Sequence, residues 1–329
     1  MILVLCANAG VDRTYEVENF AVGHYHNPRR QRIVAGGKGI NVARALRALG
    51  AKVLITGFAG GVAAKFIEQE MVRIGAHPAF VPIGEESRVC INIIDRNSRT
   101  ETRLDELGPL VTPTEVDRLR RRWARGLEKV RIAVISGSAP RGAPYDLYAE
   151  LIELCHRAGV PVILDARDEM LLNALDAKPT VVKPNVNEVE RILGRPVPVP
   201  EGVYAIAREW VASGIDEAII SFGGQGAIGV SSDGQAFWAK PPEIEYVSGV
   251  GSGDAMVGGI AAAMHSGLGL YDQLRWGTAA GAANAATFGA CLFDREAVRK
   301  MVAGVKIVPL ADDGRPAAPG PVEEEQNAD

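Results

Sequence analysis

The chain alternates apolar runs of strand length with amphipathic runs of helix length over most of its 329 residues. Runs such as ILVLCAN, RIAVISGS and VPVILDARD are rich in β-branched residues, and helical patterns such as YDLYAELIELCHRAG separate them. Strands joined by helical crossovers run parallel and are buried on both faces, which accounts for their nearly continuous apolar character. The pattern therefore predicts an α/β fold with a mainly parallel central sheet and helices on both faces.

Two stretches, residues 12–34 and 86–108, break this alternation. Their polar and apolar residues alternate singly, as in RTYEVENF and SRVCINIID, and this spacing is typical of a sheet with one exposed face. We predict that both stretches form one small β-sheet, which lies as a lid over the α/β core. The core would then comprise residues 1–11, 35–85 and 109–311.

The composition is that of an ordinary globular chain, with 47% hydrophobic and 23% charged residues. The net charge of −4 gives no reason to expect a nucleic-acid partner, and no apolar run approaches the length of a membrane-spanning helix. Four well-separated cysteines without a Cys-x-x-Cys pair favour buried thiols, so we expect a cytoplasmic protein. Residues 312–329 are rich in proline, alanine and acidic residues, and are expected to be a disordered tail.

The stretch VSGVGSGDAMVGGIAAAM, residues 247–264, places a single carboxylate, Asp254, at the start of an apolar helical run. The glycines before Asp254 let the backbone turn tightly, and the helix contributes unpaired N–H groups and the positive end of its dipole. Such a helix start suits the charge of a phosphoryl group in transfer, and Asp254 could take a proton from a substrate hydroxyl. The structural alternative is that the glycines only form a turn and Asp254 only complements the helix dipole.

A second glycine-rich motif, AGGKGINVARALRALG, occupies residues 35–50. It lacks the third glycine of a dinucleotide-binding fingerprint, and no Gly-Lys in the chain is followed by Ser or Thr, as a Walker loop requires. We interpret the motif as a loop where a ligand approaches the backbone, with Lys38 and Asn41 facing that ligand. A structural turn with a solvated lysine is the alternative.

Two further motifs follow predicted strands. In VVKPNVNEVE, Asn185 and Glu188 fall on the first turn of a helix, although an Asn followed three residues later by an acid is also a capping pattern. In SFGGQGAIGV, a plain β-hairpin would explain the glycine-rich turn. Asp165 also ends a predicted strand, where it could shape a site or simply be solvated. Because open α/β sheets bind ligands where their strands end, the motifs together indicate one ligand site.

In their order along the chain, these motifs resemble those of the ribokinase-like (PfkB) sugar kinases. The resemblance covers roughly residues 1–305 and rests on N-A-x-x-D, GGKGxNxA, SGSxPRG, KPNxxE, SxGGxGA and GxGSGDA. Within the family, GGKGINVARAL, SGSAPRG and SRVCINI are most similar to the branch of 1-phosphofructokinases and tagatose-6-phosphate kinases.

The resemblance implies roles for the residues that match the family motifs. Asp254 would be the catalytic base, and the anion hole would be supplied by Gly251, Ser252 and Gly253. Mg²⁺ and water would be positioned by Asn185 and Glu188. The acceptor would be bound by Asp12, Gly36, Gly37, Lys38, Asn41, Arg88 and Ser138. Of these, Lys38 and Arg88 would hold the phosphate that the acceptor already carries. ATP would be bound by Lys183, Asn185, Ser221, Gly223, Gly226 and Asn284, with Asn284 near the adenine.

Three departures from the family pattern bear on the substrate. Ala9 follows the asparagine of the opening motif, where the family usually has proline, and Ser248-Gly249 replaces the common Asn-Thr. Arg167 and Asp168 stand where phosphofructokinases usually carry Ser-Gly. None of the three removes a catalytic group, but Arg167 would add positive charge close to the site if it points inward.

Together these features predict an ATP- and Mg²⁺-dependent kinase of a phosphorylated ketohexose, of the fructose 1-phosphate or tagatose 6-phosphate type. One alternative is a kinase of an unphosphorylated sugar or nucleoside, which Lys38 and Arg88 disfavour. A second is a non-catalytic sugar-phosphate sensor, which the intact Asp254 loop disfavours, and a third is a dinucleotide-dependent oxidoreductase, which the incomplete fingerprint disfavours. Pairing two lids would cover their open strand edges, so a homodimer is expected.

Overall fold

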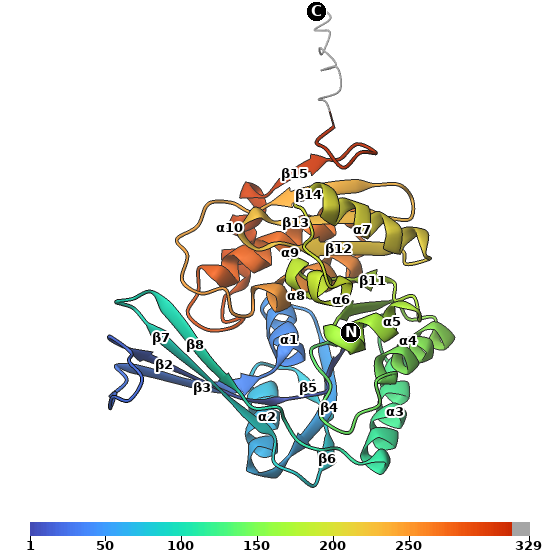
Figure 1. Cartoon of the computed structure of the whole chain (residues 1–329). Helices are drawn as coiled ribbons and strands as arrows, with labels where there is room; N and C mark the ends of the chain where they lie inside the picture. Colours follow the sequence, from blue (N-terminus) through green and yellow to red (C-terminus); the bar gives the residue numbers. More distant parts are fainter. Residues whose placement is uncertain (318–329) are drawn as a thin grey trace, which may run out of the picture.

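The computed structural model describes residues 1–317 and has the predicted α/β architecture (Figure 1). The main sheet has eleven strands. Parallel pairing joins β12, β11, β10, β9, β1 and β4 in that spatial order, and both β5 and β6 pair with β4. Strands β13, β14 and β15 extend the sheet beyond β12 in antiparallel pairing. The main-sheet strands are β1 (Ile2–Cys6), β4 (Val53–Gly60), β5 (His77–Pro78), β6 (Val81–Ile83), β9 (Ile132–Ser136), β10 (Val162–Asp165), β11 (Val181–Val182), β12 (Glu217–Ser221), β13 (Ala227–Ser231), β14 (Ala236–Lys240) and β15 (Lys306–Pro309).

Helices cover both faces of this sheet (Figure 1). Side chains alternate between the faces of a strand, so Ile2 and Val4 of β1 pack on the side of α1 and α8, and Leu3 and Leu5 pack on the side of α3 and α4. The prediction of a mainly parallel sheet between two helical layers is therefore confirmed. The helices are α1 (Lys38–Ala48), α2 (Gly61–Arg73), α3 (Pro113–Leu127), α4 (Leu147–Ala158), α5 (Asp168–Leu175), α6 (Val186–Leu193), α7 (Glu201–Ala212), α8 (Ser252–His265), α9 (Leu270–Ala285) and α10 (Arg295–Gly304).

A separate four-stranded sheet, which we call the small sheet, projects from the main body (left in Figure 1). Its strands lie in the order β3 (Arg30–Gly36), β2 (Gly10–Val17), β7 (Arg88–Asp95) and β8 (Thr100–Asp105). The pair β2 and β7 is parallel, and the other two pairs are antiparallel. Strand β8 is exposed along its whole length. The small sheet is drawn from the two stretches in which polar and apolar residues alternate, and its action as a lid stays a prediction.

The carboxyl-terminal end of the described chain runs back along β15. Leu310 forms a β-bridge with Pro316, and the Ala317 N–H donates to the Pro309 carbonyl over 2.9 Å. Pro316 and Ala317 of the predicted tail thus pair with the chain at the end of β15, and residues 318–329 lie outside the described part of the chain. Within residues 1–317, no helix is both long and apolar enough to span a membrane. The four cysteines are free and buried, as predicted.

The parallel strands β1 and β4 approach each other closely at the carboxyl end of β1. Gly57 of β4 pairs with Cys6 of β1 at a φ of +151°, and a Cβ at this position would lie 1.8 Å from the Cys6 carbonyl oxygen. Only glycine fits here, because any side chain would collide with backbone that is fixed by strand pairing.

Gly57→Ala should lower the free energy of unfolding by at least about 2 kcal/mol, because the methyl group must push β4 away from β1. Gly84→Ala is the matched control, since nothing lies within 4 Å of a Cβ at that position. Chemical denaturation of both variants checks this expectation. Equal stability of the two variants would contradict the close approach of the two strands.

Candidate active site

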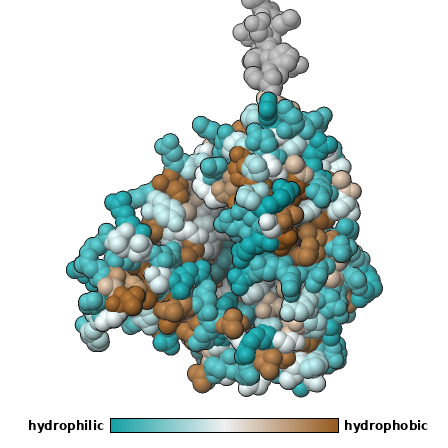
Figure 2. All heavy atoms as spheres, viewed as in Figure 1, coloured by the Kyte–Doolittle hydropathy of each residue, from teal (hydrophilic) through white to brown (hydrophobic). Residues whose placement is uncertain are grey.

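The carboxyl ends of β1, β9, β10 and β11 form the floor of a cavity of about 630 Å³, and the small sheet forms one of its walls. Figure 2 shows the molecular surface hollowed between the small sheet and the main body. The predicted site residues that line the cavity are Asp12, Gly37, Lys38, Asn41, Arg88, Ser138, Lys183, Asn185, Glu188, Ser221, Gly223, Gly251, Ser252, Gly253 and Asp254. The strand ends thus bring together motifs that are far apart in the sequence, as the sequence predicted.

A second cavity of about 600 Å³ adjoins the first. It runs between the turn after β12 and the helices α8 and α9, and its lining includes the apolar side chains of Ile244 and Met256. Gly226 lines this second cavity rather than the first. Six residues line both cavities, so the two form one groove: Ser221, Gly223, Tyr246, Gly249, Ser252 and Gly253.

Asp254 lies in the first turn of α8, next to residues that line both cavities, and is 6% exposed. Gly251, at the N-cap, adopts a left-handed φ of 85°, which turns the loop sharply into the helix. Burial raises the pKa of Asp254 to about 6, although the nearby Lys38 ammonium acts in the opposite direction. The carboxylate is therefore charged at neutral pH, yet basic enough to accept a proton from a hydroxyl that becomes acidic during reaction.

A short chain of hydrogen bonds orients this carboxylate. The Asn41 Nδ2 atom donates to Asp254 Oδ2 over 2.8 Å, and Arg44 Nη1 donates to Asn41 Oδ1 over 2.9 Å. Because Arg44 can only donate, it fixes the carbonyl end of the Asn41 amide and leaves the NH₂ end for Asp254. Arg44 is itself held by the Ala35 and Ala290 carbonyl oxygens, at 2.8 and 3.1 Å.

Two lysines and two carboxylates form an ionic cluster on the cavity floor. Asp165 Oδ1 lies 3.3 Å from Lys183 Nζ and 3.5 Å from Lys38 Nζ, and Glu188 Oε1 lies 3.1 Å from Lys38 Nζ. Burial opposes the charged form of Asp165, but Lys183 and Lys38 hold its pKa below the usual value. Burial likewise opposes the charged form of Lys38, but Asp165 and Glu188 raise its pKa. Asp165 and Lys38 are thus both held in their charged forms.

The cluster changes the interpretation of Lys38. We predicted that Lys38 would hold the phosphate on the acceptor, whereas its ammonium is already bound by two carboxylates, Asp165 and Glu188. Lys38 lines the cavity, and its contact with a ligand stays a prediction. The sequence could not reveal that Asp165 at the end of β10 and Glu188 of α6 would share its ammonium.

Asn185 and Glu188 form a reciprocal capping box at the start of α6. The Glu188 N–H donates to Asn185 Oδ1 over 3.0 Å, and the Asn185 N–H donates to Glu188 Oε2 over 2.9 Å. The capping pattern is therefore confirmed. Both residues also line the cavity, and their contact with a ligand stays a prediction.

The donor set near α6 suits a magnesium ion that is shared with a bound nucleotide. Within residues 1–317, no group of three or more His, Cys, Asp or Glu residues is placed to hold a metal. Mg²⁺ commonly keeps several waters and binds through one or two carboxylates plus substrate phosphates. Glu188 and Asn185 fit that mode, because they would contribute oxygens at the cavity wall without forming a complete cage.

The small sheet contributes the other wall of the cavity through Asp12 and Arg88. Burial raises the pKa of Asp12, although the Arg88 guanidinium acts in the opposite direction. A Cβ on Gly36 would lie 2.1 Å from Asp12 Oδ1, so Gly36 leaves room for the carboxylate rather than lining the cavity itself. Arg88 Nε donates to the Asn8 carbonyl over 3.1 Å, and Asn8 Nδ2 donates to Ser138 Oγ over 3.4 Å.

Asn284 does not face either cavity, contrary to the predicted contact with adenine. It is 0% exposed, and its amide is used within the protein. Asn284 Nδ2 donates to the Val250 carbonyl and to Ser252 Oγ, both at 2.9 Å, and Asn284 Oδ1 accepts from the Cys291 N–H at 2.7 Å. Asn284 therefore fastens the glycine-rich loop before α8.

The predicted anion hole is also partly altered. The Ser252 N–H donates to the Gly249 carbonyl over 3.1 Å within the loop. The Ser252 N–H is therefore not available to an anion, whereas other N–H groups at the start of α8, including those of Gly253 and Asp254, have no partner within the helix.

Several residues that line the cavity or support its lining were not predicted from the sequence. Arg44 lies on the same helical face as Asn41, three residues further on, so its spacing was a usable signal. Glu101, Arg103 and Asp105 reach the cavity from β8. Their alternation shows that they share a face of that strand, but the sequence does not show which face meets the ligand.

A profile of the pfkB family of carbohydrate kinases matches residues 4–296. The chain belongs to this family. The motif resemblance is thereby confirmed, and the protein is a sugar kinase, a phosphotransferase that acts on an alcohol group. Kinases of the PfkB family use ATP, usually with Mg²⁺.

Solved structures of phosphofructokinases are similar over nearly the whole chain. A possible 1-phosphofructokinase from Thermotoga maritima is 27% identical, with a TM-score of 0.87 over 94% of this chain and 100% of that chain. Phosphofructokinase-2 from Escherichia coli, in its tetrameric inhibited form, is 28% identical, with a TM-score of 0.84 over 92% and 98%. A putative phosphofructokinase from Staphylococcus aureus is 28% identical, with a TM-score of 0.79 over 94% and 99%. The branch inferred from the motifs is thus confirmed.

Asp254→Asn should raise the melting temperature more at pH 8 than at pH 5. The folded state raises the pKa of Asp254 to about 6, so it binds a proton more tightly than the unfolded state does. The free energy of unfolding of the wild type therefore falls, by on the order of 2 kcal/mol, as the pH rises through the pKa of Asp254 in the folded state. A neutral amide avoids that loss.

Thermal unfolding of both proteins at the two pH values measures the effect. Asp272→Asn is the control, because Asp272 also lies in the first turn of a helix. If Asp254→Asn raised the melting temperature equally at pH 5 and pH 8, Asp254 would not be the source of the pH dependence of stability.

Proposed function

We propose that the protein transfers the γ-phosphoryl group of ATP to a hydroxyl of a phosphorylated ketohexose, with Asp254 as the catalytic base. The observation that carries the proposal is the position of this buried carboxylate. It lies at the amino terminus of α8, where a charged acceptor cavity joins a more apolar cavity that can take the nucleotide. Kinase chemistry requires this meeting of two substrates at one proton acceptor.

In this proposal, Asp254 accepts the proton of the attacking hydroxyl, and the Asn41 amide keeps the carboxylate in place. The N–H groups of the first turn of α8 face the charge that spreads over the phosphoryl oxygens. Mg²⁺, when bound with ATP near Glu188, supplies further positive charge to the phosphates. The small sheet would limit the access of water, which otherwise competes as acceptor.

Arg88 is the best-placed group for the phosphate that the acceptor already carries. Within residues 1–317, Arg88 forms no ion pair with a carboxylate. Its remaining N–H donors are therefore available to two oxygens of a phosphate group. Asn8 links Arg88 to Ser138, because the Asn8 carbonyl accepts from Arg88 Nε and Asn8 Nδ2 donates to Ser138 Oγ. Phosphofructokinase-2 from Escherichia coli, which is 27% identical, was solved with fructose-6-phosphate, and this ketose joins fructose 1-phosphate and tagatose 6-phosphate as a candidate acceptor.

The adenine would lie in the second cavity. Ile244 and Met256 offer apolar surface there, and the turn at Gly223 and Gly226 brings backbone close to the ligand. These residues take the place of Asn284, which is buried.

The small sheet also supports a homodimer. Strand β8 is an exposed edge strand, and Ile33 and Leu104 are exposed large apolar residues of this sheet. Pairing of two small sheets would cover both the open edge and this apolar surface.

Asp254→Asn should reduce turnover by at least about a thousandfold on the preferred acceptor, because the amide cannot accept the proton and the phosphoryl-binding groups remain. ADP release with Mg-ATP is measured against fructose 1-phosphate, tagatose 6-phosphate, fructose 6-phosphate, fructose, ribose and adenosine. Turnover confined to neutral acceptors would overturn the phosphosugar assignment. Binding of a phosphosugar without any turnover would instead support a sensor.

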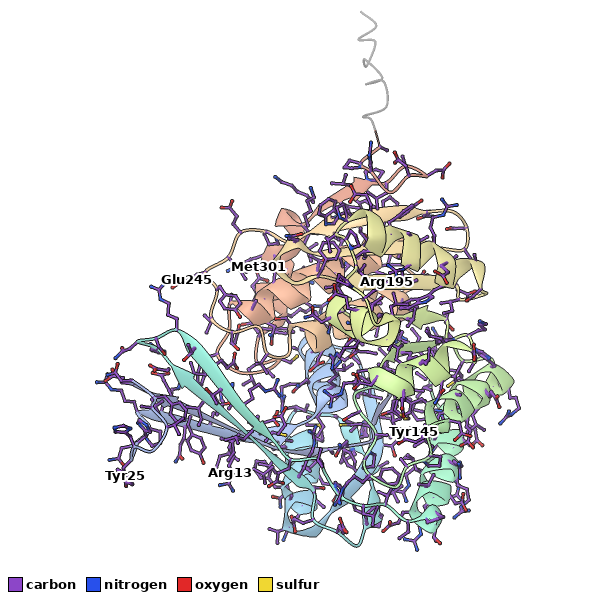
Figure 3. All side chains as sticks on the ribbon, viewed as in Figure 1. Arg13, Tyr25, Tyr145, Arg195, Glu245 and Met301 are labelled. Carbon is purple, nitrogen blue, oxygen red and sulfur yellow. The ribbon has the colours of Figure 1, made fainter. Side chains whose placement is uncertain are left out.

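Arg88→Ala should raise the KM for the phosphorylated acceptor by about ten- to a hundredfold and leave the KM for ATP nearly unchanged, because a charge-assisted pair with phosphate is lost. Arg13→Ala is the matched control. Arg13 also belongs to the small sheet, follows Asp12 on β2 and therefore lies on the opposite face, away from the main body in Figure 3. An equal change of KM for fructose in Arg88→Ala would mean that Arg88 only supports the wall.

A further inference from the structure

Arg167 follows the central strand β10 and lines the acceptor cavity, with its side chain about half exposed at 48%. Strand β10 lies between β9, whose end at Ser136 leads to Ser138 on the proposed acceptor side, and β11, whose end at Val182 leads to Glu188 of α6 on the proposed nucleotide side. A cation at the end of β10 therefore lies between the two substrates of the proposed reaction.

The next residue, Asp168, is held in an unusual conformation. It adopts a left-handed φ of 55°, which costs free energy for any residue except glycine, although Asp tolerates it better than most residues do. Asp168 Oδ2 lies 3.5 Å from Arg167 Nε, and Asp168 Oδ1 lies 3.4 Å from Arg191 Nη1 of α6. The Asp168 carboxylate thus links the start of α5 to α6 and also contacts the Arg167 guanidinium.

The charges in the cavity single out Arg167 together with Arg88. Lys38 and Lys183 are neutralised by the carboxylates of the ionic cluster, and Arg103 pairs with Asp105 at 3.0 Å. Among the described residues, Arg167 forms an ion pair only with Asp168. Their separation of 3.5 Å is long, and the Asp168 carboxylate also pairs with Arg191. Arg88 comes from the small sheet and Arg167 from the main sheet, so each wall of the cavity carries one cation free to bind a substrate.

We propose that Arg167 is a substrate-contacting residue that binds a phosphate group in the cavity, and that Asp168 is its positioning residue. The inference rests on the proposed kinase function and extends it by naming a phosphate ligand on the main-sheet wall. A planar guanidinium can offer two parallel N–H donors to one phosphate, which a lysine cannot do. The phosphate belongs either to the acceptor or to the nucleotide, because β10 lies between their two regions.

Steady-state rates with both substrates varied distinguish the two sources. Arg167→Ser should raise one KM by about ten- to a hundredfold. A rise for the phosphosugar, with the KM for ATP unchanged, assigns Arg167 to the acceptor phosphate, and the reverse assigns it to ATP. Arg167→Lys should recover part of the loss. Arg157→Ser is the matched control, because Arg157 is an exposed arginine of α4 that also pairs with an acid, Glu153, at 3.7 Å.

Asp168→Gly tests the positioning role. Glycine adopts the left-handed conformation without strain, so the melting temperature should not fall, while the same KM rises by a smaller factor, about three- to tenfold, as Arg167 loses its support. A KM that is unchanged in Asp168→Gly would remove Asp168 from the proposal.

The inference is overturned if Arg167→Ser keeps both KM values and kcat within about twofold of the wild type. Failure of the proposed function has a different signature, because the wild type itself would then turn over no acceptor. In that case calorimetric titration of wild type and Arg167→Ser with fructose 1-phosphate, and separately with Mg-ATP, decides the question. Equal affinities, or no binding of either compound, would overturn the role of Arg167.

Discussion

The attraction between buried lysines and carboxylates at the strand ends is the interaction on which the site depends. Lys183 and Asp165 are 2% and 1% exposed, and neither charge could remain in the interior without the other. Their pairing lets two neighbouring parallel strands, β10 and β11, end in charged side chains in the protein interior. Lys38 joins this cluster from α1 and Glu188 joins it from α6. The cluster therefore also fixes the glycine-rich motif of residues 35–50 relative to the capping box at the start of α6.

Asp254 differs from these carboxylates because, within residues 1–317, no lysine or arginine forms an ion pair with it. Its only side-chain hydrogen bond among the described residues comes from the neutral amide of Asn41, and burial raises its pKa. The protein therefore keeps the pKa of one buried carboxylate raised, while a nearby buried carboxylate, Asp165, is held ionised by its lysine partners. Separate environments for two nearby acids are a general way to obtain a proton acceptor at neutral pH.

Much of the fold and of the site could be predicted from the sequence. Alternating apolar strands and amphipathic helices are local patterns, so the parallel sheet follows from them. The motif residues were placed together because parallel strands end at one edge. The use of each side chain could not be predicted in the same way. Lys38 is taken up by Asp165 and Glu188, Asn284 fastens a loop, and Gly36 makes room for Asp12. These outcomes depend on contacts between residues that are 32 to 150 positions apart, or on backbone spacing, which periodicity does not encode.

The capping box at α6 has a consequence for the comparison of related chains. Asn185 and Glu188 hold the start of a helix whether or not a nucleotide is present, so a relative that had lost its activity would still gain stability from keeping them. Asp254 carries a charge that the folded protein disfavours, so such a relative would gain stability by losing it. A chain that contains the KPNxxE motif has retained the fold, whereas one that also contains the buried aspartate has retained a reason to tolerate its cost.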